Sequence, residues 1–297
     1  MNVSRRNFIL NGSAAVAAAS ISSTASALPL ATRSTKKGLA GSAPENSGLV
    51  TNWYYNWSLH PSTVGMPAVN PAIRFYPMCW GWRPAKLANA NVQDKPAGKR
   101  ETDNSTPEGL LNLKAQSASL LFGFNEPDQA GQSDLSVEAA VKAWPSLQGV
   151  ARELVSPSCA RPGGEWMSKF VPEVERQQLQ MDSLGYHTYG SDSVQAFIDH
   201  LEAFHAKYKR PVWVTEFAVA DWTARDGKTV NRFSVERVAE FMKGACAYLD
   251  RTPWVRGYAW FPTGGKFASE GKGPLVSSML FNPDGSLNDL GKLYNSI

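Results

Sequence analysis

The sequence has few of the residues that build metal centres or disulfide frameworks. Its 297 residues include three cysteines, Cys79, Cys159 and Cys246, and their spacing matches no metal-binding motif. At most one disulfide can form among three thiols, and ordinary buried cysteines are the expectation. The four histidines contain no zinc-type cluster either. We therefore expect no metal site.

Motifs for nucleotide and acyl chemistry are also missing. The chain has no phosphate-cradling G-x-x-x-x-G-K, no dinucleotide G-x-G-x-x-G after a predicted strand, and no G-x-S-x-G turn. The formal net charge of +4 falls to +2 when residues 1–27 are set aside, which is too little to indicate binding to nucleic acid or to a membrane surface. We expect no cofactor, no nucleic-acid partner and a monomer.

The N-terminus has the pattern of an export signal. Residues 4–9 read Ser-Arg-Arg-Asn-Phe-Ile, a twin-arginine motif, and a weakly apolar stretch then ends on Ala25-Ser26-Ala27. We expect residues 1–27 to be a twin-arginine signal peptide, 28–47 a linker and 48–297 a catalytic domain. The protein would then be periplasmic or extracellular. No later run reaches 18 apolar residues, so no membrane span is expected after the signal is removed.

The remaining chain alternates between strand-like and helix-like segments. Short runs rich in β-branched and aromatic residues occupy 53–57, 73–80, 118–125, 153–158, 183–189, 211–217, 256–261 and 277–281. Apolar residues recur at three-and-four spacing over 194–208, behind the cap candidates at 191–193, and over 235–249, behind Ser234. Eight strands separated by helices in about 250 residues predict an α/β fold of the (β/α)8 TIM-barrel type.

Two glutamates stand at the carboxyl ends of predicted strands, which form the working face of such a barrel. Glu126 follows the apolar run 118–125, and Glu216 follows Thr215 in the run 211–217. Two carboxylates over one pocket can cleave a glycosidic bond, because one protonates the leaving oxygen while the other attacks the anomeric carbon or activates water. We predict that Glu126 and Glu216 are the catalytic pair.

Aromatic and hydrogen-bonding residues also gather at these strand ends. The chain contains ten tryptophans, and flat faces of sugar rings stack on large aromatic side chains. Five are candidates for substrate binding: Trp57, Trp80, Trp82, Trp222 and Trp260. His187 and Tyr189 lie two residues apart and share a strand face, where they could hydrogen-bond a sugar or the carboxylates.

Five segments resemble glycoside hydrolase family 128. They are the runs LFGFNEPD at 121–128, YHTYG at 186–190, VWVTEFA at 212–218 and YAWF at 258–261, together with the terminal LFNPDGSLNDLG at 280–291. The resemblance implies an endo-β-1,3-glucanase acting on laminarin- or curdlan-type β-glucan, with a compact, somewhat irregular barrel and a retaining mechanism. It further implies that Glu126 is the acid/base, that Glu216 is the nucleophile and that Asn125 holds the 2-hydroxyl of the cleaved sugar.

One count departs from the family pattern, and two alternatives remain open. The resemblance places the glutamates on the fourth and seventh strands, whereas the runs above place them on the third and sixth. Either an early strand lies in 84–116, or the first strand is misassigned. The alternatives are a noncatalytic β-glucan-binding barrel that uses its tryptophans for capture, and a related retaining glycosidase that acts on another β-glycan.

Overall fold

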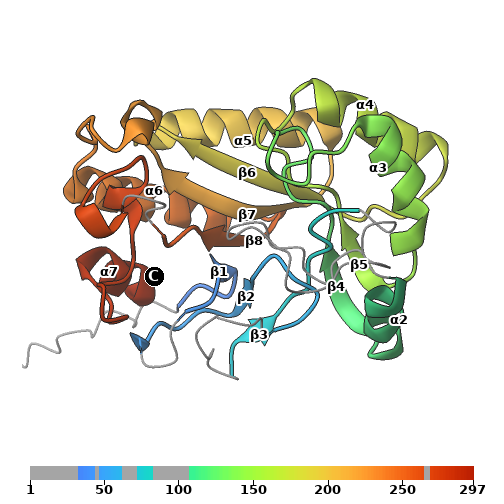
Figure 1. Ribbon diagram of the computed structural model, residues 1–297, viewed down its shortest axis with the longest axis horizontal. Helices are drawn as coiled ribbons and strands as arrows, with labels where there is room; N and C mark the ends of the chain where they lie inside the picture. The colour runs from blue at the N-terminus through green and yellow to red at the C-terminus, as the bar shows by residue number, and fades with distance from the viewer. Residues whose placement is uncertain (1–32, 44–46, 62–71, 83–106, 264–267) are drawn as a thin grey trace, which may run out of the picture. The chain divides into compact units, whose positions relative to one another are not determined.

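The computed structural model describes residues 33–43, 47–61, 72–82, 107–263 and 268–297 (Figure 1). The predicted signal peptide, and most of the segment 84–116 in which an early strand was considered, lie outside these residues. Its strands are β1 (Lys37–Ala40), β2 (Trp53–Tyr55), β3 (Arg74–Phe75), β4 (Ala118–Phe122), β5 (Ala151–Val155), β6 (Leu184–Gly190), β7 (Val212–Val219) and β8 (Val255–Trp260). No helix of the described chain is long and apolar enough to span a bilayer.

Helices alternate with these strands, as the spacing predicted. The α-helices are α2 (Pro107–Ala115), α3 (Val137–Ala143), α4 (Glu165–Arg176), α5 (Val194–Tyr208), α6 (Val235–Arg251) and α7 (Asp289–Ser296), and the 3₁₀ turns are η3 (Trp144–Leu147), η4 (Trp222–Asp226), η5 (Ala268–Glu270) and η6 (Val276–Ser278). The side chains of Ser193 and Ser234 accept hydrogen bonds from the first turns of α5 and α6. Both predicted helix starts are therefore confirmed.

All named strands pair in parallel, but they do not form one closed sheet. Six strands make a sheet of order β3-β2-β1-β8-β7-β6, and β4 pairs with β5 in a second sheet. Isolated parallel bridges join the sheets at both seams, Met78 with Phe122 and Val155 with Ser183. The expected α/β fold is present, whereas a continuous barrel sheet is not.

The buried apolar residues of the strands are divided between two clusters. The larger cluster contains Leu39, Leu121 and Leu154 together with side chains of α3 to α7, so it lies between strands and helices. The smaller cluster takes its fully buried members from β1, β2, β4, β5, β7 and β8 and from Met78, and includes no helix residue. The alternation of side chains along each strand therefore builds an inner core that both sheets share.

Large aromatic rings fill this inner core, and glycines make room for them. The rings of Trp53 and Trp213 lie 5.2 Å apart at nearly a right angle. A Cβ atom on Gly38 would lie 2.3 Å from Trp53, and one on Gly257 would lie 2.4 Å from Trp213. These two strand positions accept only glycine because the indoles stand directly over the backbone.

The strand β1 corrects the expected domain boundaries and strand count. It lies within 28–47, where a linker was expected, and all four of its residues are buried. Lys37 is only 1% exposed, because its Nζ donates to the carbonyl oxygens of Tyr294 and Asn295 at the end of α7. With β1 counted, Glu126 follows the fourth strand and Glu216 lies on the seventh. The strand missed in the sequence is therefore β1, which precedes the first predicted run.

The last predicted strand, 277–281, is wrong. Residues 276–278 form the 3₁₀ turn η6, and Phe281 makes a single antiparallel bridge with Leu287. Ser278 is fully buried, and its hydroxyl donates to the carbonyl oxygen of Val219 in β7. The apolar run therefore closes over the end of β7 and adds no strand to the sheet.

Candidate active site

An irregularity in β7 directs the side chain of Glu216 toward the inner side of the sheet. Tyr186 pairs with Val214 and His187 pairs with Glu216, so Thr215 is an extra residue opposite β6. The pairing with β8 shifts across the same segment. Such a bulge re-aims the side chain that follows it. Without it, Glu216 would share the outward face of Val214.

Glu126 is placed by a left-handed turn just past β4. Its φ of 41° lies in a region that residues with a side chain rarely adopt. Its N–H donates to the carbonyl oxygen of Ser158 at 2.7 Å, and the N–H of Asn125 donates to that of Trp80 at 2.9 Å. The hydroxyl of Ser158 lies 2.9 Å from that of Thr215, so Ser158 connects the backbones beside the two glutamates.

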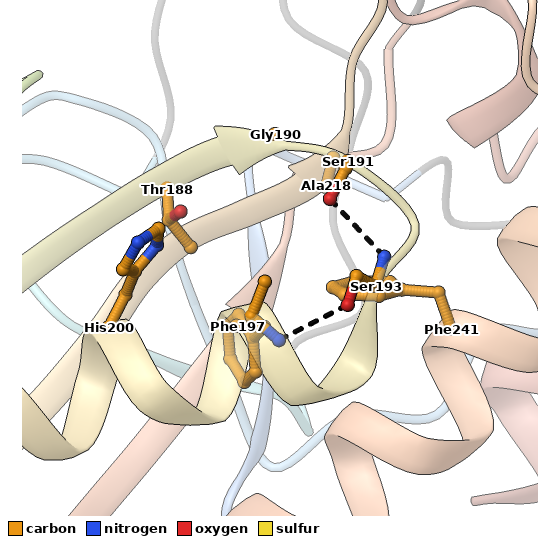
Figure 2. Close-up of a pocket in the computed structure, with 9 residues that line it drawn as sticks. Thr188, Gly190, Ser191, Ser193, Phe197, His200, Ala218 and Phe241 are labelled. Carbon is orange, nitrogen blue, oxygen red and sulfur yellow. Dashed lines mark hydrogen bonds between the residues drawn. The ribbon is translucent and has the colours of Figure 1, made fainter.

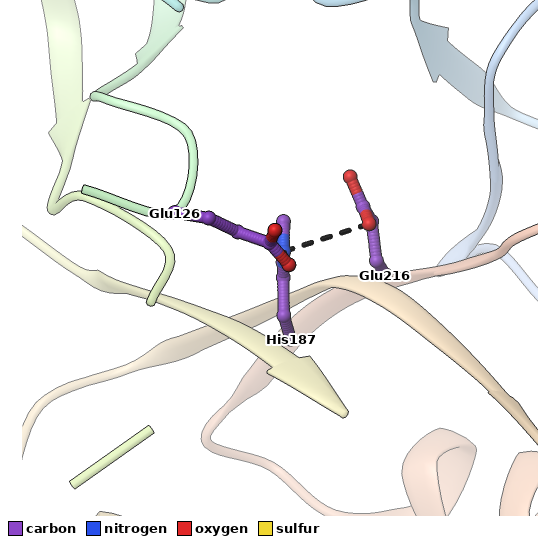
Figure 3. Close-up of side chains that lie close together, drawn as sticks. All are labelled: Glu126, His187 and Glu216. Carbon is purple, nitrogen blue, oxygen red and sulfur yellow. Dashed lines mark hydrogen bonds and ion pairs between the residues drawn. The ribbon is translucent and has the colours of Figure 1, made fainter. Parts of the chain in front are cut away.

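The two glutamates and His187 converge from separate elements (Figure 3). One oxygen of each carboxylate and one nitrogen of the imidazole all lie within 4.8 Å of one another. Nδ1 of His187 is 3.2 Å from Oε1 of Glu126 and 3.5 Å from Oε2 of Glu216. Glu126 is 6% exposed and Glu216 is 4% exposed. The sequence-predicted pair therefore meets in one place, with an imidazole between the two carboxylates.

Three neutral donors surround the carboxylate of Glu216. The hydroxyl of Tyr55 donates to Oε1 at 2.6 Å, and Nε1–H of Trp57 donates to the same oxygen at 2.8 Å. The hydroxyl of Tyr189 donates to Oε2. Sequence reasoning missed Tyr55, although it lies two residues before Trp57 in the predicted strand run 53–57, where alternate residues are expected to share a face. These three donors fix the orientation of the Glu216 carboxylate.

Burial and charge shift the proton affinities of the groups around Glu216. Burial, with the adjacent charge of Glu216, raises the pKa of Tyr55 and of Tyr189 well above 10, so both phenols keep their protons. Burial of His187 opposes its charged form, but the carboxylates of Glu216 and Glu126 outweigh burial and raise the pKa of His187 above its ordinary value of 6.5. The two carboxylates therefore increase the proton affinity of the imidazole that lies between them.

The spacing of Glu126, His187 and Glu216 would also suit three ligands of a metal ion. The hydrogens around Glu216 argue against that use, because they point at both of its oxygens. A cation on the same lone pairs would face the positive ends of these O–H and N–H dipoles. The arrangement fits a hydrogen-bonded anion better than a metal ligand.

Asn125 lies beside this centre with an unused acceptor. It is 3% exposed, and its amide nitrogen donates to Oε1 of Gln132 at 3.1 Å. Its Oδ1 is buried and has no hydrogen-bond partner among the described residues. A buried polar atom without a hydrogen-bond partner destabilises the folded protein. A hydroxyl group of a bound ligand can supply the missing hydrogen bond. This atom suits the role expected of Asn125 in substrate binding.

Four of the five candidate tryptophans have accessible surface or contact the carboxylates. Trp222 is 40% exposed and donates its Nε1–H to the carbonyl oxygen of Tyr189. The guanidinium carbon of Arg225 lies 4.5 Å from the centre of its ring. Trp80 and Trp82 are partly exposed, as is Trp57, whose indole nitrogen contacts Glu216. Trp222 is therefore the most open aromatic platform among these five.

Trp260 is not available to a ligand, which corrects its predicted role. Its exposure is 0%, and its Nε1–H donates to the carbonyl oxygen of Ser278 at 2.8 Å. Its ring lies 5.0 Å from that of Phe217 and 6.2 Å from that of Tyr294. The side chain packs β8 against η6 and α7, on the outer face of the sheet.

A small pocket lies apart from the carboxylates, between the sheet and its helices (Figure 2). It has a volume of about 80 Å³ and is bordered by Thr188 of β6, Ala218 of β7, Phe197 and His200 of α5, and Phe241 of α6. Thr188 directly follows His187 in β6, so the two side chains point to opposite faces. The pocket is therefore behind β6 and is not part of the centre at Glu126 and Glu216.

Comparison with known proteins agrees with this geometry. The family described as glycosyl hydrolase catalytic core matches residues 32–294. The chain belongs to this family. A curated relative, alkali-sensitive linkage protein 1 of Schizosaccharomyces pombe, is 26% identical over 261 residues, which are 84% of this chain and 41% of that protein. The chain thus spans about two fifths of the length of this relative.

Solved structures narrow the family and confirm the resemblance to glycoside hydrolase family 128. A subgroup I endo-β-1,3-glucanase from Amycolatopsis mediterranei, in complex with laminaritriose, is 28% identical with a TM-score of 0.68, and the match covers 88% of this chain and 99% of that one. A subgroup VII oligosaccharide-binding protein from Trichoderma gamsii is 22% identical with a TM-score of 0.62, covering 90% and 95%. The second likeness shows a shared fold alone.

Proposed function

We propose that the protein is a retaining endo-β-1,3-glucanase that cleaves laminarin- or curdlan-type β-glucan. The observation that carries this proposal is the convergence of the glutamates, since one carboxylate oxygen of Glu126 lies within 4.8 Å of one of Glu216. Retaining glycosidases hold their carboxyl groups about 5–5.5 Å apart, whereas inverting enzymes leave roughly 6.5–9.5 Å for a water molecule. The separation here fits direct attack by one carboxylate.

In the first step, ionised Glu216 attacks the anomeric carbon while protonated Glu126 donates its proton to the leaving glucosyl oxygen. The glycosidic C–O bond breaks and a glycosyl ester forms on Glu216. In the second step, Glu126 removes a proton from water, which attacks the anomeric carbon and releases Glu216. Tyr55, Trp57 and Tyr189 would hold the attacking carboxylate in a fixed orientation.

The substrate assignment rests on family membership and on the groups around the carboxylates. The Amycolatopsis relative was crystallised with laminaritriose, a β-1,3-linked trisaccharide. In this chain, Oδ1 of Asn125 would accept a hydrogen bond from a sugar hydroxyl, and the exposed ring of Trp222 would stack on a pyranose face. A panel of β-1,3-, β-1,4- and β-1,6-glucans, mannan and xylan, assayed by reducing ends, tests the linkage.

Glutamine variants test the two catalytic roles. Glu126→Gln and Glu216→Gln should each lower laminarin turnover by several orders of magnitude while the thermal melting curve stays close to wild type. Azide should restore activity to Glu216→Gly and give a glycosyl azide of inverted configuration, because a small anion can enter the space of the missing carboxylate. Near-normal laminarin hydrolysis by either glutamine variant would remove that residue from the mechanism.

Size analysis of the products tests the mode of attack. An endo-acting enzyme releases a range of oligosaccharides from laminarin at early times, whereas an exo-acting enzyme releases one short product. Accumulation of a single product from the first minutes would replace the endo proposal with an exo one and leave the two glutamates in their roles.

Noncatalytic glucan binding is the second candidate function. It is favoured by the Trichoderma relative, which shares the fold and is described as oligosaccharide-binding. A binding protein needs no acid and no nucleophile, and both glutamates are present here with a full set of donors. Retardation of the protein by laminarin in a native gel, without any new reducing ends, would support binding over hydrolysis.

We further infer that the fold is a barrel and that the protein is exported. The strand order, the bridged seams and the shared inner core support a (β/α)8 barrel that is open at two seams. The twin-arginine sequence supports export, which would place the enzyme where polymeric glucan occurs. Cell fractionation and sequencing of the mature N-terminus would test export, with cleavage expected after Ala27.

A further inference from the structure

The segment around Glu126 lacks one hydrogen bond that a regular parallel ladder would supply. The N–H of Ser158 donates to the carbonyl oxygen of Phe124, and the carbonyl oxygen of Ser158 accepts from the N–H of Glu126. In a continued ladder, the carbonyl oxygen of Glu126 would next accept from the N–H of Ala160. It accepts instead from Gln129, because the left-handed turn at Glu126 rotates it away.

The carboxylate of Asp128 takes the place of that missing carbonyl. Its Oδ1 accepts from the N–H of Ala160 at 2.8 Å, and its Oδ2 accepts from the N–H of Arg161 at 3.0 Å. The guanidinium of Arg161 donates to the carbonyl oxygen of Asp128 and lies 3.5 Å from Oδ2. The side chain of Asp128 is only 5% exposed, although that of Arg161 is 70% exposed.

Pro127 explains why a side chain, and not a backbone carbonyl group, accepts the hydrogen bond from the N–H of Ala160. Proline fixes its own φ and has no N–H, so the chain cannot return to the ladder directly after Glu126. The next residue, Asp128, is the first that can reach the amides of the β5–α4 segment. The order Glu-Pro-Asp therefore combines an exit from the strand with a side-chain anchor two residues later.

We propose that Asp128 is a positioning residue for the acid/base Glu126. Its two hydrogen bonds to the 160–161 backbone stabilise the left-handed conformation of Glu126 and so fix the carboxyl group against the leaving-group oxygen. This inference rests on the proposed glucanase function and adds to it a residue that touches neither substrate nor nucleophile. The carboxylate of Asp128 bonds the backbone at 160–161 and not β7, whereas that of Glu216 is held by Tyr55, Trp57 and Tyr189, so Asp128 acts on Glu126.

The consequence is a defect specific to acid catalysis. General acid catalysis contributes about 10²–10⁴-fold, and a displacement of about 1 Å can cost 10²-fold. A leaving group that departs without a proton, such as 2,4-dinitrophenolate, needs no help from Glu126 in the first step. Loss of Asp128 should therefore slow cleavage of a glucosyl leaving group and spare cleavage of an activated aryl one.

The test compares Asp128→Asn with wild type on laminarin and on 2,4-dinitrophenyl β-laminaribioside, using the initial burst of the aryl substrate to isolate the first step. We expect kcat on laminarin to fall roughly 10–100-fold, with KM and the aryl burst rate within about threefold of wild type. Asp134→Asn is the matched control, since it removes the same charge from an exposed position on the same loop. It should behave as wild type on both substrates.

A structural readout accompanies the kinetics. Amide hydrogen exchange at Ala160 and Arg161 should accelerate in Asp128→Asn and remain unchanged in Asp134→Asn. If Asp128→Asn does not fold, Asp128→Glu keeps the charge but moves the oxygens outward, and it should show the same selective loss on laminarin.

Several outcomes would overturn the inference. Equal losses on both substrates would reduce Asp128 to a general stabiliser of the fold, and an unchanged kcat on laminarin would show that Glu126 is positioned without it. A wild-type protein that hydrolyses neither substrate would refute the glucanase function and this inference with it. An active wild type with an unaffected Asp128→Asn variant would refute the inference alone.

Discussion

Substitutions of Trp260 and Trp222 test which tryptophan stabilises the fold and which one binds the proposed substrate. Trp260→Phe removes the indole N–H that satisfies the carbonyl oxygen of Ser278, and both residues have 0% exposure. Leaving that carbonyl buried and unpaired costs about 1–3 kcal/mol. The smaller ring also loses packing against Phe217 and Tyr294, for which about 1 kcal/mol is a conservative figure.

The expected destabilisation of Trp260→Phe is therefore about 2–4 kcal/mol. For a domain of this size, each kcal/mol lowers Tm by about 2–4 °C, so the melting temperature should fall roughly 5–15 °C. Activity per folded molecule at a temperature well below Tm should stay close to wild type, because the indole has no exposed surface. Differential scanning calorimetry with laminarin assays on the same samples measures both quantities.

Trp222→Ala should behave in the opposite way. Its ring is 40% exposed and lies 6.0 Å from that of Tyr189, on the side of the nucleophile. We expect Tm to change by less than about 2 °C, because substitutions at exposed positions have small effects on stability. KM for laminarin should rise about tenfold as a stacking surface is lost. The reasoning fails if Trp260→Phe keeps its Tm but binds laminarin more weakly.

Three further outcomes are expected. Tyr55→Phe deletes a hydrogen bond to the ionised Glu216 worth about 1.5–3 kcal/mol, so kcat should fall roughly 10–100-fold; an unchanged kcat would mean that Trp57 and Tyr189 suffice. Gly257→Ala places a methyl group 2.4 Å from the ring of Trp213 and should cost about 1–3 kcal/mol in urea denaturation; an unaltered midpoint would contradict the packing described here. The pKa of His187 is raised in the folded state, so protonated His187 stabilises the fold below its unfolded pKa, and this contribution disappears as pH rises through the folded value. The stability advantage of wild type over His187→Asn should therefore shrink as the pH rises above 6.5, the ordinary pKa of histidine, and a constant difference in urea denaturation would exclude that linkage.

Much of the fold was present in the periodicity of the sequence. Seven of the predicted strand runs overlap strands of the structure, and the helices behind Ser193 and Ser234 begin where their caps predicted. Such patterns are local, because alternation and three-and-four spacing depend only on neighbours along the chain. The strand β1 carried no such signal, since its four residues are all buried and one of them is a lysine. Only the carbonyl groups at the end of α7 make that lysine tolerable in a buried strand.

The meeting of Glu126 and Glu216 in one place was also predicted from the sequence, because both stand at the carboxyl ends of predicted parallel strands. The direction of each side chain was decided by the tertiary structure. Glu216 faces inward because Thr215 is an extra residue between β6 and β8, and Trp260 faces outward onto α7. A one-residue change in register reverses the face of a strand, and register is set by pairing partners far along the chain. The sequence by itself therefore determined which residues stand at the strand ends, whereas packing between distant strands decided which of them meet.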